Sequence, residues 1–308
     1  MRPAAMGRAL PEGSERVFEQ PKETVGPAAV REGAEMMRPQ AVSAQHAAGA
    51  QVFRLSLLGG FGLRASGKEH SFASGSCRLV ALLALSGQPM QRSAVAGILW
   101  PEATDARACA CLRSALARLG HVRDHLLRVT ATELSLGQAV RVDLREAQAC
   151  AQHLLVGDGP LSRADRCGHS EELLSLELLP GWYEDWVLLQ AEAWRQFRLH
   201  ALEALSARLS GEDCHARAVS AALTAVAADP LRESARSVLI RAYLAESNRS
   251  EALREFETYR QLLRRALGVE PTARLHGLVG VAMQASGLSG AMRMNLHMTS
   301  SGSARAAN

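Results

Sequence analysis

The hydrophobic pattern of this chain changes its period twice within about a hundred residues, and this change limits the folds that it can adopt. Residues 53–57 alternate apolar and polar side chains with the period of two that is typical of a strand. After Gly59-Gly60 the alternation continues over residues 61–64, and Ser66-Gly67-Lys68 predicts a turn before a third short strand at 70–72. The period then becomes helical, and strands return at 126–130, 133–136 and 140–144. This order predicts strands, then three helices, then a terminal hairpin.

The three predicted helices differ in character. Residues 76–86 form an apolar run that ends at Gly87, and a short helix at 94–99 ends before Trp100-Pro101. The third helix, 104–120, has an apolar stripe on one side and a small, basic surface on the other. The stripe consists of Ala108, Leu112, Ala115, Leu116 and Leu119, whereas Arg107, Cys111, Ser114 and Arg118 lie opposite, with Arg113 on one flank.

A helix, a turn, a longer basic helix and a hairpin form the layout of a winged helix-turn-helix. Between Phe53 and Glu146 there are 12 Arg and Lys against 7 Asp and Glu, a balance of +5 that suits a phosphate-binding surface. We expect Arg107, Ser114 and Arg118 to face the major groove of double-stranded DNA, with Arg113 at its edge. Arg128 and Arg141 are predicted to lie on the wing, near phosphates.

The rest of the chain is predicted to be almost wholly helical. Paired Ala- and Leu-rich segments closed by Asp229-Pro230 and Glu270-Pro271 are similar to tetratricopeptide-type helix pairs, although a 34-residue period is not kept. The predicted fold is therefore mainly α, with an α+β N-terminal part. The predicted parts are a disordered extension at 1–50, a winged helix at 52–146, a helical domain at 147–285 and a disordered tail at 286–308. The predicted helices of the helical domain are 145–156, 171–179, 187–209, 215–228, 231–246 and 249–267, with a loop at 157–168.

Several other functions find little support in the residues. Cys109 and Cys111 point to different sides of a helix, so no metal site is predicted there, and no cofactor motif is present. His121 and His125 lack the carboxylate of a zinc-enzyme motif, which argues against an enzyme. Trp182, Trp186 and Trp194 are expected to fill a core more than to line a ligand pocket. No aliphatic run is long enough for a bilayer and no secretory signal is evident, so we expect a cytoplasmic protein without membrane contact.

Taken together, the two halves resemble the SARP family, the Streptomyces antibiotic regulatory proteins, and the related AfsR-type regulators. The resemblance rests on LSLLGGFGLR (55–64), ILWPEATDARA (98–108), LRSALARLG (112–120), ELLPGWYEDWV (177–187), AADPLRESARSVLIRAYL (227–244) and RSEALREFETYRQLLRRALGVEPTARL (249–275). It implies an OmpR-like winged helix followed by a bacterial transcriptional activation domain. It further implies an activator of transcription that binds promoter DNA, contacts RNA polymerase and allows a homo-oligomer on DNA.

The third helix departs from the family pattern. Family members read Ala-Arg-Asn-x-Leu-Arg before the apolar stripe, whereas this chain has Ala108-Cys-Ala-Cys-Leu-Arg113. An alternative hypothesis is therefore a helical adaptor for protein–protein contacts, whose winged helix has lost strong DNA binding. The retained Arg107, Arg113 and Arg118 favour the activator over the adaptor.

Overall fold

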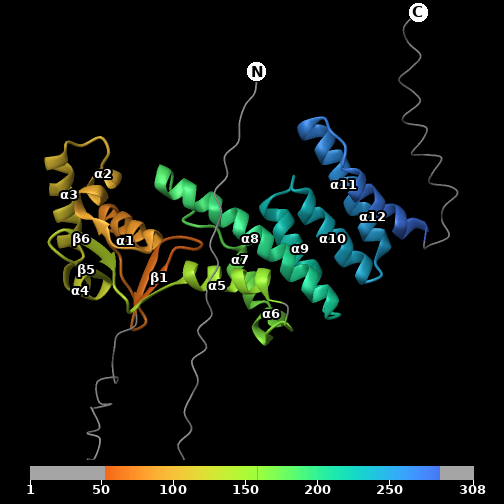
Figure 1. Ribbon diagram of the computed structural model, residues 1–308, viewed down its shortest axis with the longest axis horizontal. Coiled ribbons are helices and arrows are strands. Elements are labelled where there is room, and N and C mark those ends of the chain that lie inside the picture. Colours follow the sequence, from red (N-terminus) through yellow and green to blue (C-terminus); the bar gives the residue numbers. More distant parts are fainter. Residues whose placement is uncertain (1–52, 158, 285–308) are drawn as a thin grey trace, which may run out of the picture. The chain divides into compact units, whose positions relative to one another are not determined.

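The structure is a computed structural model that describes residues 53–157 and 159–284 (Figure 1). The predicted extension at 1–50 and tail at 286–308 lie outside the described residues. Within the described ranges, the named strands all belong to residues 53–142, and from Asp143 onward the named elements are helices. We call residues 53–142 the winged-helix half and residues 143–284 the helical half. The prediction of a mainly helical protein with an α+β N-terminal part is confirmed.

The winged-helix half contains the predicted order of strands and helices, together with three short elements that the sequence pattern did not predict: β4, η1 and α4. Its elements are β1 (Phe53–Ser56), β2 (Gly62–Ala65), β3 (Lys68–Glu69), α1 (Ser74–Ser86), β4 (Met90–Gln91), α2 (Arg92–Leu99), α3 (Asp105–Arg118), the 3-10 turn η1 (Gly120–Val122), α4 (Arg123–Leu126), β5 (Leu127–Val129), β6 (Glu133–Leu136) and β7 (Val140–Val142).

The strands form two sheets, with the orders β3-β2-β1-β7 and β4-β6-β5. The predicted hairpin is present, since β5 and β6 pair antiparallel. The third strand, however, lies at Lys68–Glu69 and not at 70–72. Ser66 and Gly67 both adopt positive φ angles, 47° and 78°, which is the backbone of a two-residue hairpin turn. Pairing therefore resumes at once, with Lys68 opposite Ala65.

Strand β7 follows the hairpin and pairs parallel with β1. These are the last and the first strands of the winged-helix half in sequence. Strand β7 is shorter than the predicted 140–144, because Asp143 begins a helix. The Asp143 carboxylate accepts hydrogen bonds from the backbone N–H groups of Leu144 (2.7 Å), Leu57 (2.9 Å) and Leu58 (3.2 Å). Burial raises the pKa of Asp143, and these three N–H donors oppose that rise. One side chain thus binds an N–H group in the first turn of α5 and also fixes the end of β1.

The helical half contains eight named helices among the described residues, two of which the sequence pattern did not predict. A reciprocal capping box between Ser162 and Asp165 starts α6 within the predicted loop, and α12 follows Pro271. The predicted helix at 171–179 ends at Ser175, because Leu178 forms a bridge with Leu58 in an extended segment. The helices are α5 (Asp143–Val156), α6 (Arg163–Cys167), α7 (His169–Ser175), α8 (Asp185–Gly211), α9 (His215–Ala228), α10 (Glu233–Ala245), α11 (Arg249–Leu267) and α12 (Ala273–Gln284).

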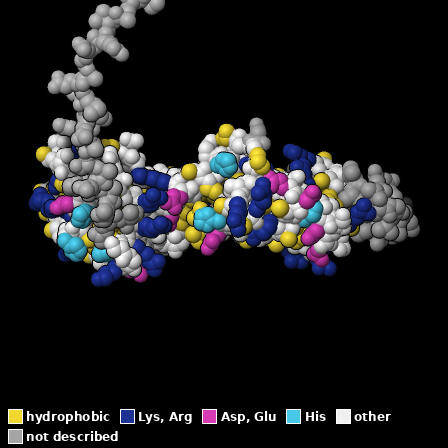
Figure 2. Space-filling model, turned by 90° about the horizontal axis from the view of Figure 1, so that it is seen from below, with side chains coloured by type: hydrophobic (Ala, Val, Ile, Leu, Met, Phe, Trp, Pro, Cys, Tyr) yellow, Lys and Arg dark blue, Asp and Glu magenta, His cyan; other side chains and the backbone are white. Residues whose placement is uncertain are grey.

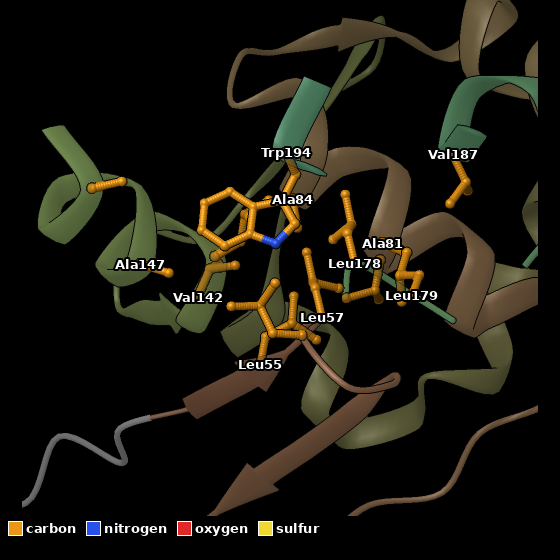
Figure 3. Packing of buried hydrophobic residues seen from close by; sticks show 14 of the residues in the cluster. Leu55, Leu57, Ala81, Ala84, Val142, Ala147, Leu178, Leu179, Val187 and Trp194 are labelled. Carbon is orange, nitrogen blue, oxygen red and sulfur yellow. The ribbon is translucent and has the colours of Figure 1, made fainter. Parts of the chain in front are cut away.

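One hydrophobic cluster extends across both halves (Figure 3). Leu57 of the winged-helix half and Leu178, Leu179 and Val187 of the helical half are almost completely buried in the same cluster. Two backbone hydrogen bonds cross the same junction, from Leu179 N–H to the Leu57 oxygen and from Gly59 N–H to the Glu177 oxygen, each 2.8 Å long. The predicted division near residue 146 therefore runs through a continuous packed core.

Candidate nucleic-acid interface

Helix α3 separates its side chains by face as its sequence predicts. Ala108, Leu112, Ala115 and Leu116 are buried against the core, and Leu119 follows them immediately after the helix. The side chains of Arg107, Arg113, Ser114 and Arg118 are all exposed. Thr104 occupies the N-cap position but its side chain makes no capping hydrogen bond, whereas Asp105 places a negative charge in the first turn, where the helix dipole favours it. The exposed surface of α3 is therefore small and basic.

Helix α3 follows α2 after the turn at residues 100–104, and the two helices contact each other. Trp100 belongs to this turn, and its ring lies against α1: a Cβ added to Gly75 would stand 3.6 Å from it. Backbone hydrogen bonds from Ala103 N–H to the Trp100 oxygen (3.1 Å) and from Ala108 N–H to the Thr104 oxygen (2.8 Å) lead the chain into α3. This arrangement is a helix-turn-helix whose second helix carries the basic surface.

A buried hydroxyl group, which the sequence pattern did not reveal, attaches α3 to α1. The Ser76 side chain is fully buried, and its Oγ donates a hydrogen bond to the backbone oxygen of Ala115 at 2.8 Å. Because Ala115 lies in the last turn of α3, this bond fixes the depth at which the C-terminal end of α3 sits on α1. A lone serine in an apolar run gives no sequence signal for such a role.

Replacing Ser76 with alanine should destabilise the protein by about 1–3 kcal/mol, because the Ala115 oxygen loses a buried donor. Urea denaturation followed by circular dichroism measures the change. Ser86→Ala is the matched control: it removes a hydroxyl group at the end of the same helix, where the side chain is half-buried. A loss at Ser76 no larger than at Ser86 would contradict a buried role for the bond.

The wing is the hairpin of β5 and β6, and it is attached to α2. Arg92 binds the tip twice, since its N–H donates to the Thr132 oxygen (2.9 Å) and its Nη1 to the Thr130 oxygen (3.2 Å). Strand β4 pairs with β6 and extends the hairpin into a three-stranded sheet. The predicted wing residue Arg128 lies on β5 opposite Ser135, and its side chain is exposed. Arg145, which was not predicted as a site residue, lines the same hollow as Arg128.

Arg141 does not lie on the wing, so that part of the prediction is wrong. It belongs to β7 in the other sheet, directly opposite Arg54 of β1, which in turn pairs with Arg64 of β2. Its nearest carboxylate is that of Glu146, at 3.9 Å. The error has a physical reason: β7 follows the hairpin in sequence but pairs with the first strand, and local patterns do not reveal that long-range pairing. A DNA contact by Arg141 stays a prediction.

Among the residues that the structure describes, the four arginines on α3 and the wing have no carboxylate partner. Among the ion pairs of the described residues, none includes Arg107, Arg113, Arg118 or Arg128. Their charges are thus available to an anionic ligand. On the face in Figure 2, however, Lys and Arg side chains occur on both halves, so charge density alone does not identify the site.

The three tryptophans at the junction have different surroundings. Trp194 is only 3% exposed, and its Nε1 donates to the Leu176 oxygen at 3.0 Å, so the expected core role holds for it. Trp182 and Trp186 are half-buried, with Trp182 stacked on Phe61 at a centroid distance of 6.0 Å. Across residues 53–157 and 159–284, no three His, Cys, Asp or Glu side chains are grouped closely enough to hold a metal ion. No helix in these ranges is both long and apolar enough to cross a membrane.

The fold and the surface of α3 define a winged helix-turn-helix protein with an attached helical domain. Comparison with known proteins gives the family. Residues 162–280 match the model of the bacterial transcriptional activator domain. Regulatory protein AfsR of Streptomyces coelicolor is 32% identical over 274 residues, which cover 82% of this chain and 26% of AfsR. AfsR of Streptomyces griseus is 31% identical over 245 residues, which cover 73% of this chain and 24% of that protein.

The chain belongs to the SARP/AfsR-type family of regulators. It spans about a quarter of the length of the AfsR proteins that it matches. Among solved structures, Mycobacterium tuberculosis EmbR in complex with a low-affinity phosphopeptide has a TM-score of 0.60 at 18% identity, covering 77% of this chain and 66% of that chain. This likeness extends the shared fold over both halves. The family model begins at residue 162, after α5, so the predicted domain start at 147 stays a prediction.

Proposed function

We propose that this protein is a sequence-specific DNA-binding regulator of transcription, acting in the cytoplasm as an activator on promoter DNA. The observation that carries the proposal is the outer surface of α3. Arg107, Arg113, Ser114 and Arg118 are exposed there, and the three arginines have no carboxylate partner among the described residues. A helix with small and basic exposed residues enters a major groove closely, and arginine binds guanine edges and phosphates with two parallel hydrogen bonds.

The wing supports the same proposal. Arg128 is exposed on β5, and Arg92 holds the hairpin tip against α2, so the wing has a fixed position beside the helix-turn-helix. Such a hairpin is suited to phosphate contacts, which set the register of a protein on its duplex without reading the bases. We therefore assign base contacts to Arg107, Ser114 and Arg118, an edge contact to Arg113 and a phosphate contact to Arg128.

The helical half is proposed to contact RNA polymerase or a second copy of the chain. Support comes from the match to a bacterial transcriptional activator domain and from the AfsR relatives. Stacked helix pairs of this kind offer extended surfaces for protein contacts. The alternative, a helical adaptor without strong DNA binding, draws on the absence of the family's Arg and Asn between Ala108 and Leu112.

Fluorescence polarisation with labelled duplexes from the promoters next to the gene, at several salt concentrations, tests the proposal. Arg107→Ala and Arg118→Ala should each weaken binding to the preferred duplex by about 1–3 kcal/mol and relax its specificity. Arg128→Ala should weaken all duplexes alike and reduce the salt slope by about one. Arg241→Ala is the matched control, because Arg241 is also exposed but lies on α10.

Two outcomes would contradict the proposal. If the Arg107, Arg118 and Arg128 variants bound every duplex as the unsubstituted protein and the Arg241 variant do, the assigned surface would be wrong. If the unsubstituted protein bound no duplex more tightly than unrelated DNA, the adaptor hypothesis would replace the activator.

A further inference from the structure

Arg78 of α1 connects the helix-turn-helix with the helical half. Its Nη2 donates a hydrogen bond to the oxygen of Leu99 at 2.9 Å, and its Nε lies 2.9 Å from Oε1 of Glu184. Leu99 is the last residue of α2, and Glu184 is the N-cap residue of α8. The Nε contact lacks the geometry of a hydrogen bond, so the attraction between Arg78 and Glu184 is chiefly that of two opposite charges.

The hydrogen bond from Arg78 to Leu99 lies where the chain leaves α2 and turns toward α3. Arg78 lines a hollow of about 550 Å³ together with the residues of the turn at 100–104 and with Arg107 of α3. The oxygen of Leu99 immediately precedes this turn. A side chain that holds this oxygen therefore limits how the turn, and with it the start of α3, can shift on α1.

The contact of Arg78 with Glu184 is anchored in the helical half. Glu184 starts α8, since its backbone oxygen accepts hydrogen bonds from Val187 N–H (2.8 Å) and Leu188 N–H (3.0 Å). Val187 is completely buried in the shared core, so the first turn of α8 has a fixed place. The Glu184 carboxylate is thus presented to Arg78 from a rigid element.

Burial strengthens this ion pair relative to an ordinary surface pair. The side chains of Arg78 and Glu184 are 24% and 27% exposed, and salt screens such partly buried charges less than fully exposed ones. The Arg254–Glu251 pair on α11 offers a comparison within the chain: at a similar distance of 3.0 Å, its two side chains are 74% and 34% exposed.

We propose that Arg78 is a positioning residue through which Glu184 of the helical half fixes the turn before α3, and thereby sets the affinity of α3 for DNA. This inference rests on the proposed function. Because coupling between two sites is reciprocal, a partner that displaces the start of α8 changes DNA affinity, and DNA binding changes the affinity for that partner to the same extent. The ion pair thus gives the helical half a direct influence on the helix-turn-helix.

The key variant is Glu184→Gln in the full chain, since it removes the negative charge but leaves the Arg78 hydrogen bond to Leu99. Glu251→Gln is its matched control, because it neutralises the carboxylate of a surface ion pair at the other end of the helical half. Hydrogen exchange of the amides at 100–108, measured without DNA, reports on the turn itself. Exchange there should rise about fivefold in Glu184→Gln, with no change in β6 or α10 and none in the control.

The second readout is the dissociation constant for the preferred duplex, which should rise about fivefold in Glu184→Gln and not in Glu251→Gln. Arg78→Gln should raise the dissociation constant at least as much as Glu184→Gln does. The double variant should have the same dissociation constant as Arg78→Gln alone, as expected for two members of one pair.

Each other outcome overturns the inference or separates it from the proposed function. Unchanged exchange at 100–108 overturns it, and so does exchange that rises equally throughout the molecule, because the pair then only stabilises the fold. An unchanged dissociation constant despite faster exchange in the turn overturns the link to DNA affinity. If the unsubstituted protein binds no duplex, the proposed function fails, while the exchange result still decides whether Glu184 positions the turn.

Discussion

Replacing Trp194 with alanine is expected to destabilise the winged-helix half and the helical half together, by about 3–5 kcal/mol. The indole is 3% exposed and lies in the cluster that also contains Leu55, Leu57 and Leu178 (Figure 3). Its removal leaves a cavity between the halves and an unpaired oxygen on Leu176, which had accepted the Nε1 hydrogen bond. Because the core is continuous, neither half can relax to fill the cavity without shifting the other.

The measurement is thermal unfolding, with hydrogen exchange at residues of β1 and of α9 as the readout. Both should lose protection in one transition, with a midpoint lowered on the order of 10 °C. Trp194→Phe is the control, since it keeps a buried aromatic ring but removes the N–H donor and part of the indole volume, so it should cost less than the alanine variant. Two separate transitions, with β1 unchanged in the alanine variant, would contradict a shared core.

A shared core also changes what is expected of fragments. A chain that ends near residue 155 would expose Leu57 and Leu58, which the structure buries against the helical half. Exposed apolar surface of this kind lowers the stability of a fragment and favours its association. DNA binding and activation are therefore better separated by substitutions on α3 than by cutting the chain.

Much of the winged-helix half could be predicted because its signals are local. The apolar stripe of α3 repeats with the helical period, so its buried residues and its exposed arginines both follow from spacing. The hairpin of β5 and β6 likewise follows from alternation around a short turn. In each case the burial of a side chain depends on neighbours a few residues away.

The features that sequence reasoning missed depend on distant partners. The sequence predicts Arg141 on the wing because it follows the hairpin, yet β7 pairs with β1, whose residues lie 87 positions earlier in the chain, as Phe53 does from Val140. Nothing in the sequence distinguishes Asp143 from a surface carboxylate, but its carboxylate accepts hydrogen bonds from the backbone N–H groups of Leu57 and Leu58. Arg78 and Ser76 belong to a largely apolar helix, and only the packed structure shows what they contact. A pattern along the chain does not reveal contacts between residues that are far apart in sequence.

A buried charge near the C-terminal end of the helical half likewise has a partner that the sequence pattern does not predict. Arg236 of α10 is 6% exposed and forms an ion pair with Glu255 of α11. Its Nε and Nη2 donate to the Pro230 oxygen at 3.2 and 3.1 Å, and its guanidinium carbon lies 5.4 Å from the centre of the Tyr259 ring. Burial raises the pKa of Tyr259 to about 12, so this ring stays neutral at physiological pH. Glu255 is thus the carboxylate that balances the charge of Arg236.

Replacing Glu255 with alanine should therefore cost about 3–5 kcal/mol, because it leaves the Arg236 guanidinium charged and buried without its partner. Urea denaturation monitored on the helical half measures the loss. The double variant Arg236→Met with Glu255→Leu should recover most of it, since two packed apolar side chains replace a buried ion pair at little cost. The control is Glu251→Gln on the same helix, whose ion pair with the exposed Arg254 should contribute less than about 1 kcal/mol. If Glu255→Ala cost no more than this control, the ion pair would contribute little, and the packing of α10 on α11 would rest on the apolar cluster that includes Phe256, Tyr259 and Leu263.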